Sequence, residues 1–463
     1  VYAMLQEADT IGIFQVESAA QMQTITRIRP QNIVDMSFEV AAVRPGVGAN
    51  DGVSEFINRR EKQVSNPSFE VTYDHPLEEE PLKRTLGIIL FQDQFNELAS
   101  KVAGFSAKEA DEFRRAYLRP HERDDIASYW WPRFLQGALE NGLDTRTAGK
   151  IFKKFNGQYM FPEAHAYAFG ATAYHLAWLK FYYPLEFFVS LFDEQPMGFY
   201  NIETLKEDAK RHGISVLGPD VNKSQSSVSI ESDCLRLGLR NIQGIGRETS
   251  SKIINSRQDR PYVSVEDFMG RCDVPQSLLE KLAYAGALDT VSNLSRRDLR
   301  WEIGLRHRPH GSQFVLPLPI NHDTPSLPSL TDFEQMLDEY RTMGIHPSSH
   351  LMAYLRERLV GVANSLEILG MPDGTKVEVA GLVVRKQCPL ANAYFITLED
   401  EFGHIPTILW PGIYARYRHV IRKPILRVAG KVSRRGGTMN IVVERVEPID
   451  AAPSLNLKSK DWS

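Results

Sequence analysis

Residues 161–180 read FPEAHAYAFGATAYHLAWLK and set His165 and Lys180 among aromatic and small apolar side chains. The apolar spacing predicts a helix that ends before Pro184, because proline lacks the amide hydrogen that would continue it. A second helix is predicted around ADEFRRAY, residues 110–117, which carries two adjacent arginines. Guanidinium and ammonium groups hold phosphates and flat rings stack on bases, so these two stretches together suggest a surface for a polyanion.

Composition sets the class of protein. The chain has 463 residues, enough for about two to four domains, and its 43% hydrophobic and 24% charged residues are ordinary for a globular protein. The net charge of -4 argues only against a uniformly basic protein, since a DNA channel can be basic while the exterior is not. The three cysteines form no CxxC pair, which argues against a zinc site and fits a reducing cytoplasm. No stretch is long and apolar enough to span a bilayer.

The pattern changes along the chain and predicts a multidomain α+β protein. The first part is mostly helical, and a capping box of Ser106 and Glu109 starts one of its helices. A proline-rich stretch near residues 307–328 marks a boundary, and five alternating strands with one helix between the third and fourth then indicate a closed barrel of OB type. The expected domains are a helical region at 1–200, a helix-hairpin-helix region at 201–305, a linker with connecting helices at 306–373, the barrel at 374–450 and a tail at 451–463.

The candidate residues of the helical region also have plain structural interpretations. Paired arginines such as Arg114 and Arg115 are common on solvated helix faces, and a lone histidine such as His165 is more often a core residue than a ligand. The segment RPGVGANDGVSEFINRR, residues 44–60, offers glycines whose amides can approach a phosphate, together with three arginines. A flexible surface loop explains that segment equally well. Its arginines are Arg44, Arg59 and Arg60.

IQGIG at residues 242–246 is typical of a helix-hairpin-helix turn. Gly244 and Gly246 would leave backbone amides free to hold a DNA phosphate without reading its sequence, and Lys252 follows on the next helix. Any tight turn uses glycines, so the pentapeptide alone is weak. The later stretch LLEKLAYAGALD, residues 278–289, fits the second half of such a motif.

The barrel segment combines positive charge with aromatic residues. No aspartate or glutamate occurs from Phe402 to Val443. That composition is typical of a platform for single-stranded DNA, although some of the aromatic residues, Phe395 above all, would be barrel core. The candidate DNA-binding residues here are Trp410, Arg416, Arg418, Arg434 and Arg435.

These phrases together resemble the fingers region and the following domains of bacterial C-family DNA polymerases, the polymerase III alpha subunit type. The resemblance covers roughly residues 10–305 and 330–463. The Phe-Pro-Glu at 161–163 and SRRDLRWEIG at 295–304 resemble the error-prone, ImuC-type branch; the main branch has Asn-Lys-Ser where this chain has Pro162-Glu163-Ala164. We therefore expect the C-terminal portion of an error-prone polymerase that acts in translesion synthesis and DNA repair.

The resemblance implies roles for the candidates. Arg114 and Arg115 would lie beside the triphosphate of an incoming dNTP, with His165, in a turn that leads into the fingers helix, and Arg44 nearby. Lys180, Arg59 and Arg60 would line the DNA path. Implied partners are a primer–template, ImuA- and ImuB-like mutagenesis accessory proteins and, indirectly, a sliding clamp.

The metal-binding carboxylates that nucleotidyl transfer needs are not found in this sequence. In the family they lie upstream of the phrase that opens here as FQVES, residues 14–18, and the acidic runs Asp124-Asp125 and Glu399-Asp400-Glu401 are expected on surface turns. We therefore assign no catalytic or metal-binding residue; Mg²⁺ would be held by the family's palm domain, and this chain alone should bind DNA without polymerising. The alternative is a stand-alone, non-catalytic protein for single-stranded or branched DNA.

Overall fold

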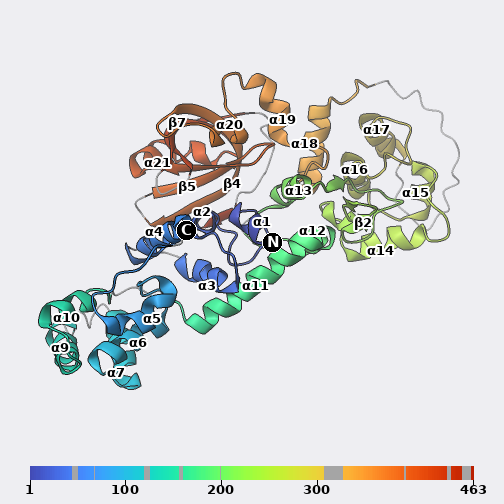
Figure 1. Ribbon diagram of the computed structural model, residues 1–463. Helices are drawn as coiled ribbons and strands as arrows, with labels where there is room; N and C mark the ends of the chain where they lie inside the picture. The colour runs from blue at the N-terminus through green and yellow to red at the C-terminus, as the bar shows by residue number, and fades with distance from the viewer. Residues whose placement is uncertain are drawn as a thin grey trace. The chain divides into compact units, whose positions relative to one another are not determined.

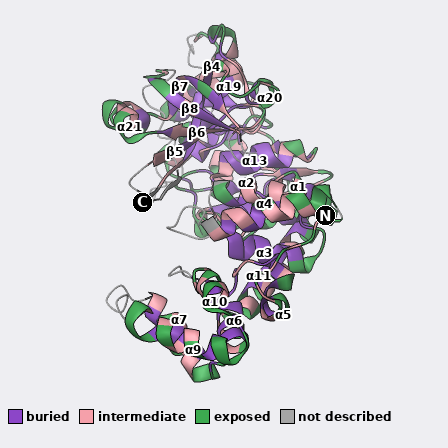
Figure 2. Ribbon diagram, turned by 60° about the vertical axis from the view of Figure 1, so that its left-hand side comes forward, coloured by how far each residue is buried: buried purple, intermediate pink, exposed green. Residues whose placement is uncertain are grey.

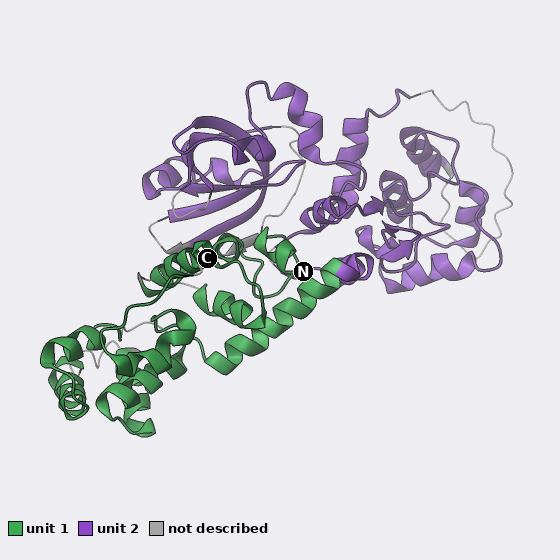
Figure 3. Ribbon diagram, in the orientation of Figure 1, with its two compact units in different colours: residues 1–181 green, residues 182–463 purple. Residues whose placement is uncertain are grey.

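The computed structural model describes residues 1–43, 51–66, 68–118, 126–155, 160–198, 200–306, 327–390, 393–434, 439–450 and 460–462. The chain divides into two compact units, residues 1–181 and residues 182–463, each considered by itself below (Figures 1 and 3). None of the helices described is both long and apolar enough to cross a membrane.

Unit 1 is built from helices, as the sequence predicts. One core lies among α6, α7, α9 and α10, where Phe95, Phe113 and Phe134 are fully buried. The predicted capping box is present, because the Ser106 hydroxyl accepts from the Glu109 amide and the Glu109 carboxylate accepts from the Ser106 amide. The elements are α1 (Tyr2–Gln6), α2 (Ala19–Ile28), α3 (Ile33–Ala42), α4 (Asp51–Ser65), η1 (Pro76–Glu78), α5 (Glu79–Leu82), η2 (Lys83–Thr85), α6 (Gln92–Ala103), α7 (Ala107–Leu118), the π-helical turn η4 (Ile126–Trp130), α9 (Trp131–Glu140), α10 (Thr145–Phe152) and α11 (Glu163–Tyr182).

Helix α11 packs through small residues. Ala166, Gly170, Ala173 and Ala177 recur at helical spacing and are buried, and a Cβ on Gly170 would lie only 2.9 Å from the Ser37 amide nitrogen of α3. The small seam lets the two backbones approach closely, which leaves the bulky aromatic side chains of α11 on its other faces.

Unit 2 opens with helices and a three-stranded sheet of order β1-β3-β2. Its helix-hairpin-helix region runs from η5 through α17, and three further helices lead to the barrel. The elements before the barrel are α12 (Pro184–Asp193), α13 (Ile202–Arg211), β1 (Ser215–Leu217), β2 (Ser229–Glu231), β3 (Cys234–Arg236), η5 (Leu239–Asn241), α14 (Arg247–Ser256), α15 (Val265–Arg271), α16 (Gln276–Tyr284), α17 (Arg296–Arg306), α18 (Asp332–Met343), α19 (Leu351–Leu355), η6 (Arg356–Arg358) and α20 (Ser365–Leu369).

The C-terminal strands close into a barrel, which confirms the predicted five strands with a helix between the third and fourth. The sheet order is β5-β6-β8-β7-β4, and β5 pairs back onto β4 to close it. The short strand β9 adds to β4 in parallel, a pairing that the sequence did not predict. The elements are β4 (Lys376–Leu390), β5 (Ala393–Glu399), β6 (His404–Leu409), α21 (Pro411–Tyr417), η7 (Val420–Arg422), β7 (Ile425–Ser433), β8 (Asn440–Pro448) and β9 (Lys460–Trp462).

The acidic run at the end of β5 corrects one expectation. Glu399 and Asp400 are fully buried, not on a surface turn. The Glu399 carboxylate accepts from the Thr204 hydroxyl of α13 at 2.7 Å, and Asp400 accepts from both the amide and the hydroxyl of Ser365 at the start of α20. Both carboxylates join helices to the barrel, a role that local sequence does not reveal. Asp124 and Asp125 lie outside the described residues.

Candidate nucleic-acid interface

The two arginines of α7 share one carboxylate. Asp111 lies one turn before them and accepts from Arg114 at 2.6 Å and from Arg115 at 2.7 Å. The hydrogen bond from Arg114 is the main cause that holds the pKa of the Asp111 carboxyl below its usual range. The side chain of Arg115 is 60% exposed and that of Arg114 only 16%, so Arg115 is the guanidinium that offers more donors to a ligand.

Arg59 and Arg60 on α4 are engaged within unit 1. Arg59 donates to the Leu86 carbonyl at 2.7 Å and to Glu55, whereas Arg60 pairs with the buried Asp35 at 2.7 Å. Both guanidinium groups therefore fasten α4 to its neighbours. Arg44 lies outside the described residues.

His165 stands in a row of rings. Its imidazole stacks on Phe161 with a centroid separation of 5.0 Å and meets Phe169 edge-on at 4.3 Å, and Phe169 in turn contacts the exposed Phe14. The expectation that His165 lies in a turn before the fingers helix is wrong. Helix α11 already begins at Glu163, whose amide donates to the Asp93 carboxylate at 2.7 Å, so His165 occupies the first turn of the helix itself.

Lys180 does not lie on a DNA-facing surface. Its side chain is fully buried, and its ammonium donates to the Asp9 carboxylate at 2.6 Å and to the Ile11 carbonyl at 3.1 Å. The position continues the small, buried seam of α11. The burial of Lys180 contradicts the predicted DNA contact. Its ammonium instead holds the N-terminal segment around Asp9 and Ile11 against α11.

The first hairpin of unit 2, residues 242–246, exposes its backbone to solvent at both glycines. Ile242 and Ile245 are buried, whereas Gly244 and Gly246 are exposed, and Gly244 has a φ of +94° that favours glycine. Gly246 is the N-cap of α14 and has no side chain that could cap the helix, and no described side chain is seen to accept from the first amides of α14. The first amides of α14 are therefore left for an external acceptor, the arrangement in which backbone N–H groups hold a phosphate.

Lys281 joins this hairpin from α16 and was missed by the sequence analysis. Its ammonium nitrogen lies 3.2 Å from where a Cβ on Gly244 would stand, and no acceptor for it occurs among the described residues. Lys252, the predicted candidate, points its ammonium to Glu248 at 2.9 Å instead. The one signal for Lys281 in the sequence is that it is the single lysine of LLEKLAYAGALD, 37 residues after Gly244.

The second hairpin, the turn around Gly286 that follows α16, is covered by a side chain of the protein itself. Gly286 has a φ of +75°, but the space that its missing side chain leaves is filled by the Arg296 guanidinium. Arg296 pairs with Asp289 at 2.7 Å and with Glu339 of α18 at 2.7 Å. This hairpin therefore holds α17 and α18 together, and the first hairpin alone has the open geometry.

Much of the positive charge of the barrel is neutralised by glutamates. These glutamates lie outside the stretch from Phe402 to Val443, which has no acidic residue. Glu378 of β4 accepts from both Arg427 and Arg445, and Glu444 of β8 accepts from Lys431 at 3.1 Å. Arg434 donates to the Met371 carbonyl at 2.8 Å and to the Leu369 carbonyl, so it closes the turn after α20. Arg435 lies outside the described residues.

Some aromatic residues of the barrel pack against its core, and others are exposed to solvent. Tyr394 of β5 and Tyr414 of α21 stack with parallel rings whose centroids are 3.3 Å apart, and both pack against the barrel core. Phe395, expected in the core, is half-buried on the outward face of β5, because Ile396 and Leu398 take the inward positions. Trp410 is 50% exposed at the N-cap of α21, and Figure 2 shows α21 on the outside of the barrel, where none of its residues is buried.

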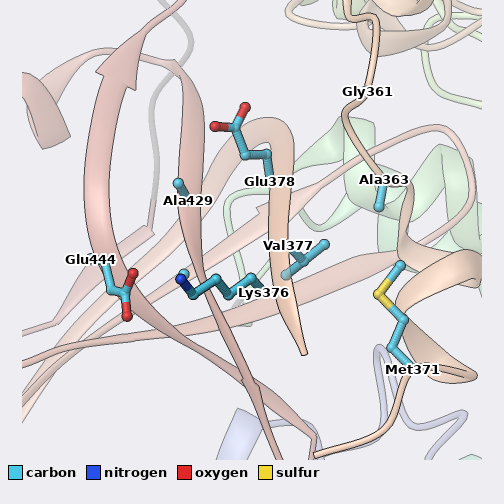
Figure 4. A pocket seen from close by; sticks show the side chains of 9 residues that line it. Gly361, Ala363, Met371, Lys376, Val377, Glu378, Ala429 and Glu444 are labelled. Atoms are coloured by element: carbon cyan, nitrogen blue, oxygen red, sulfur yellow. The ribbon is translucent and has the colours of Figure 1, made fainter. Parts of the chain in front are cut away.

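A groove of about 440 Å³ crosses the outer face of β4, β7 and β8 (Figure 4). In this view Lys376 extends toward Glu444, Glu378 lies above it, and Ala363 and Met371 lie at the right. The groove thus carries both signs of charge. It lacks the uniformly positive lining that a nucleic-acid backbone requires.

Neither unit, taken alone and within its described residues, brings together three side chains that could hold a metal ion. The donor set for a two-metal site is therefore not found among them, and Mg²⁺ chemistry is assigned to none of these residues.

Comparisons with known proteins agree with this arrangement. Residues 1–142 match the finger domain of the bacterial DNA polymerase III alpha subunit, and residues 213–299 match a helix-hairpin-helix motif. The chain therefore combines a region similar to an alpha-subunit finger domain with a region similar to a helix-hairpin-helix motif and an OB-like barrel.

Three relatives that match over the whole chain share one name. Proteins named "Error-prone DNA polymerase" are 35% identical in Corynebacterium glutamicum, 37% in Nocardia farcinica and 36% in Anaeromyxobacter dehalogenans, each over 100% of this chain. The chain spans 43%, 41% and 42% of their respective lengths. A solved asparaginyl-tRNA synthetase from Pyrococcus horikoshii aligns with 22% of this chain and 25% of its own at 18% identity and a TM-score of 0.19, which carries no argument.

Proposed function

We propose that this chain is the nucleotide- and DNA-gripping part of an error-prone, template-directed DNA polymerase that acts in translesion synthesis and DNA repair. The observation that carries the proposal is the finger-domain match over residues 1–142, followed in the same chain by an open hairpin. A stand-alone protein for single-stranded or branched DNA would have no use for the finger domain.

In this proposal the finger domain holds the incoming dNTP. Arg115 contributes the guanidinium fork for the triphosphate, and Asp111 orients both Arg115 and the less exposed Arg114. His165 and Arg44 belong to the same proposed nucleotide site. Mg²⁺, when bound, supplies charge neutralisation at the phosphates and activation of the primer hydroxyl. The carboxylates that hold it are assigned to a part of the protein outside these residues.

The first hairpin is proposed to hold one phosphate of the primer–template. The free amides of α14 and the ammonium of Lys281 face the same point beside Gly244, and neither distinguishes bases, as a polymerase requires of its duplex contacts. Arg59 and Arg60 stay in the proposal as supports of α4. ImuA- and ImuB-like accessory proteins, a sliding clamp and a cytoplasmic location follow from the family resemblance alone.

Fluorescence anisotropy of a labelled primer–template with the whole chain tests the proposal. Lys281→Gln should weaken binding and reduce the slope of log K against log salt by about 0.9, the value for one phosphate contact on duplex DNA. The matched control is Lys223→Gln, an exposed lysine of the same unit that is paired with Glu231. No measurable binding by the wild-type chain, or equal effects of the two substitutions, would overturn the proposal.

A further inference from the structure

A serine, a histidine and a glutamate of unit 2 form one continuous chain of hydrogen bonds. The Ser348 hydroxyl lies 2.9 Å from Nε2 of His346, and Nδ1 of the same ring lies 2.6 Å from the Glu339 carboxylate. A carboxylate can only accept, so Nδ1 carries the proton of the neutral ring and Nε2 is the acceptor for the serine hydroxyl. This is the order of contacts in which a histidine takes the proton of a nucleophilic serine.

The imidazole is held in one position by buried groups from several elements. His346 and Glu339 are both buried, and the second carboxylate oxygen of Glu339 accepts from Arg296 of α17 at 2.7 Å. The fully buried Lys206 of α13 reaches the segment between α18 and α19 (Figure 1). Its ammonium donates to the carbonyls of His346 at 2.9 Å and of Ser349 at 2.7 Å. The base is therefore in place before a ligand arrives, which is what a catalytic base requires.

Ser348 is exposed to solvent, unlike His346, so a ligand can reach its hydroxyl oxygen. The Tyr354 hydroxyl of α19 lies 3.2 Å from the same Nε2 nitrogen. That nitrogen has one lone pair, which the nearer Ser348 hydroxyl fills, so the Tyr354 proton has no further acceptor among the described residues. Burial is the main cause that raises the pKa of the Tyr354 hydroxyl, which keeps its proton at neutral pH. A phenol hydroxyl beside the nucleophile can donate to an oxygen on which negative charge develops.

We propose that Ser348 is the nucleophile of an acyl-transfer site, with His346 as its base and Glu339 as the residue that positions the base. The substrate class is an activated carboxylic ester, whose carbonyl carbon takes the serine oxygen and whose carbonyl oxygen takes the hydrogen bond from Tyr354. This activity goes beyond the proposed function and does not depend on it.

The proton of Ser348 accounts for each step of the reaction. It passes to Nε2 of His346 as the bond between the serine oxygen and the carbonyl carbon forms. The bond from that carbon to the alcohol oxygen then breaks, and the proton leaves on the alcohol. Water next attacks the acyl-serine ester: its proton passes through the imidazole back to the serine oxygen, and the carboxylic acid is released.

A fluorophosphonate probe, which reacts with activated serines, tests the site in the whole chain. Mass spectrometry should locate the adduct on Ser348, and labelling should be roughly 100-fold or more faster in the folded chain than in urea, the contribution expected of a general base. Ser348→Ala should abolish this adduct. The matched control is Ser349→Ala, which alters the next serine and should leave the labelling rate of Ser348 unchanged.

The supporting residues have separate readouts. His346→Gln should slow labelling by roughly 100-fold or more. Glu339→Gln should slow it as well, and Glu339→Asp should restore part of the rate, because it keeps the carboxylate that accepts from Nδ1. With p-nitrophenyl acetate the wild type should give a burst of p-nitrophenolate that Ser348→Ala lacks. Tyr354→Phe should slow that burst by roughly 100-fold, the cost of one lost oxyanion donor.

The outcomes also separate this site from the proposed function. No adduct on Ser348, equal labelling rates in the folded and the urea-unfolded chain, or a rate unchanged by His346→Gln would show an ordinary surface serine and overturn the proposal. Circular dichroism confirms folding, and the comparison with the unfolded wild type decides the matter without any variant if His346→Gln does not fold. Ser348→Ala should bind the primer–template as the wild type does, so the two proposals succeed or fail independently.

Discussion

Lys281 and Gly244 face each other across the first hairpin, although they belong to different helix pairs: the lysine Nζ lies 3.2 Å from the position that a Cβ on Gly244 would take. The same Cβ would stand 3.1 Å from Leu278, and the φ of +94° strains any other residue at this place. The glycine thus fits the backbone conformation of the hairpin and also leaves space beside the first amides of α14.

Gly244→Ala should lower the free energy of unfolding by about 1–3 kcal/mol, the cost of a residue forced into a left-handed conformation. Gly246→Ala is the matched control, because Gly246 has a φ of -88° and open space around its Cβ position. Its free energy of unfolding should change by less than about 1 kcal/mol. Thermal and denaturant unfolding measure both; equal costs would mean that the strain at Gly244 is absent.

Local features were predictable from the sequence where neighbours in the chain decide them. The capping box of Ser106 and Glu109, the isoleucines and glycines of the first hairpin, and the alternation of the barrel strands all depend on residues a few positions apart. The structure confirms each of these.

Charge pairing was not predictable, because its partners are distant in the chain. Glu378 neutralises Arg427 from 49 residues away, and Lys180 meets Asp9 across 171 residues. The lack of acidic residues at 402–443 therefore overstated the net positive charge of the barrel surface. Nor does the sequence indicate that Arg296 closes the second hairpin, because its partner Glu339 is 43 residues away in the chain.

Substitution of Arg115 should affect nucleotide use alone, whereas substitution of Arg114 should affect both nucleotide use and stability. In the full-length polymerase, Arg115→Ala should lower kcat/KM for dNTP by roughly 30-fold or more, since a guanidinium on developing phosphate charge is worth on the order of 2–4 kcal/mol. Arg114→Ala should in addition lower stability, because its guanidinium is mostly buried. Lys108→Ala on the same helix, with a side chain 84% exposed, is the control for steady-state kinetics. An equal loss of primer–template affinity would place Arg115 on the duplex instead.

Lys180→Ala should unfold unit 1 more easily and leave the DNA affinity of the folded protein unchanged. Removing the buried ammonium breaks the ion pair with the Asp9 carboxylate and costs on the order of 3 kcal/mol. The double variant Lys180→Met, Asp9→Asn should recover part of that loss, because the carboxylate charge is removed together with the ammonium that it pairs with. Unfolding midpoints are compared with anisotropy of the folded fraction. Lower DNA affinity at unchanged stability would restore the predicted DNA contact.

Glu39 on α3 makes the stability of unit 1 depend on pH. The side chain is fully buried, neither carboxylate oxygen meets a partner among the described residues, and burial raises the pKa of the carboxyl well above its usual range. The folded state therefore keeps a proton that the unfolded state has lost above about pH 4.5. Stability should fall as pH rises from there toward the raised pKa, at about 1.4 kcal/mol per pH unit at most.

Glu39→Gln removes this dependence while keeping the shape of the side chain. Its advantage over the wild type should be small near the ordinary pKa of a glutamate and should grow as the pH rises toward the raised pKa of Glu39. The exposed Glu112→Gln on α7 is the control, and its difference from the wild type should not change over that range. Denaturant unfolding of the three proteins across the pH series decides the matter. Parallel curves for the wild type and Glu39→Gln would show that Glu39 is ionised in the folded state and would contradict the raised pKa.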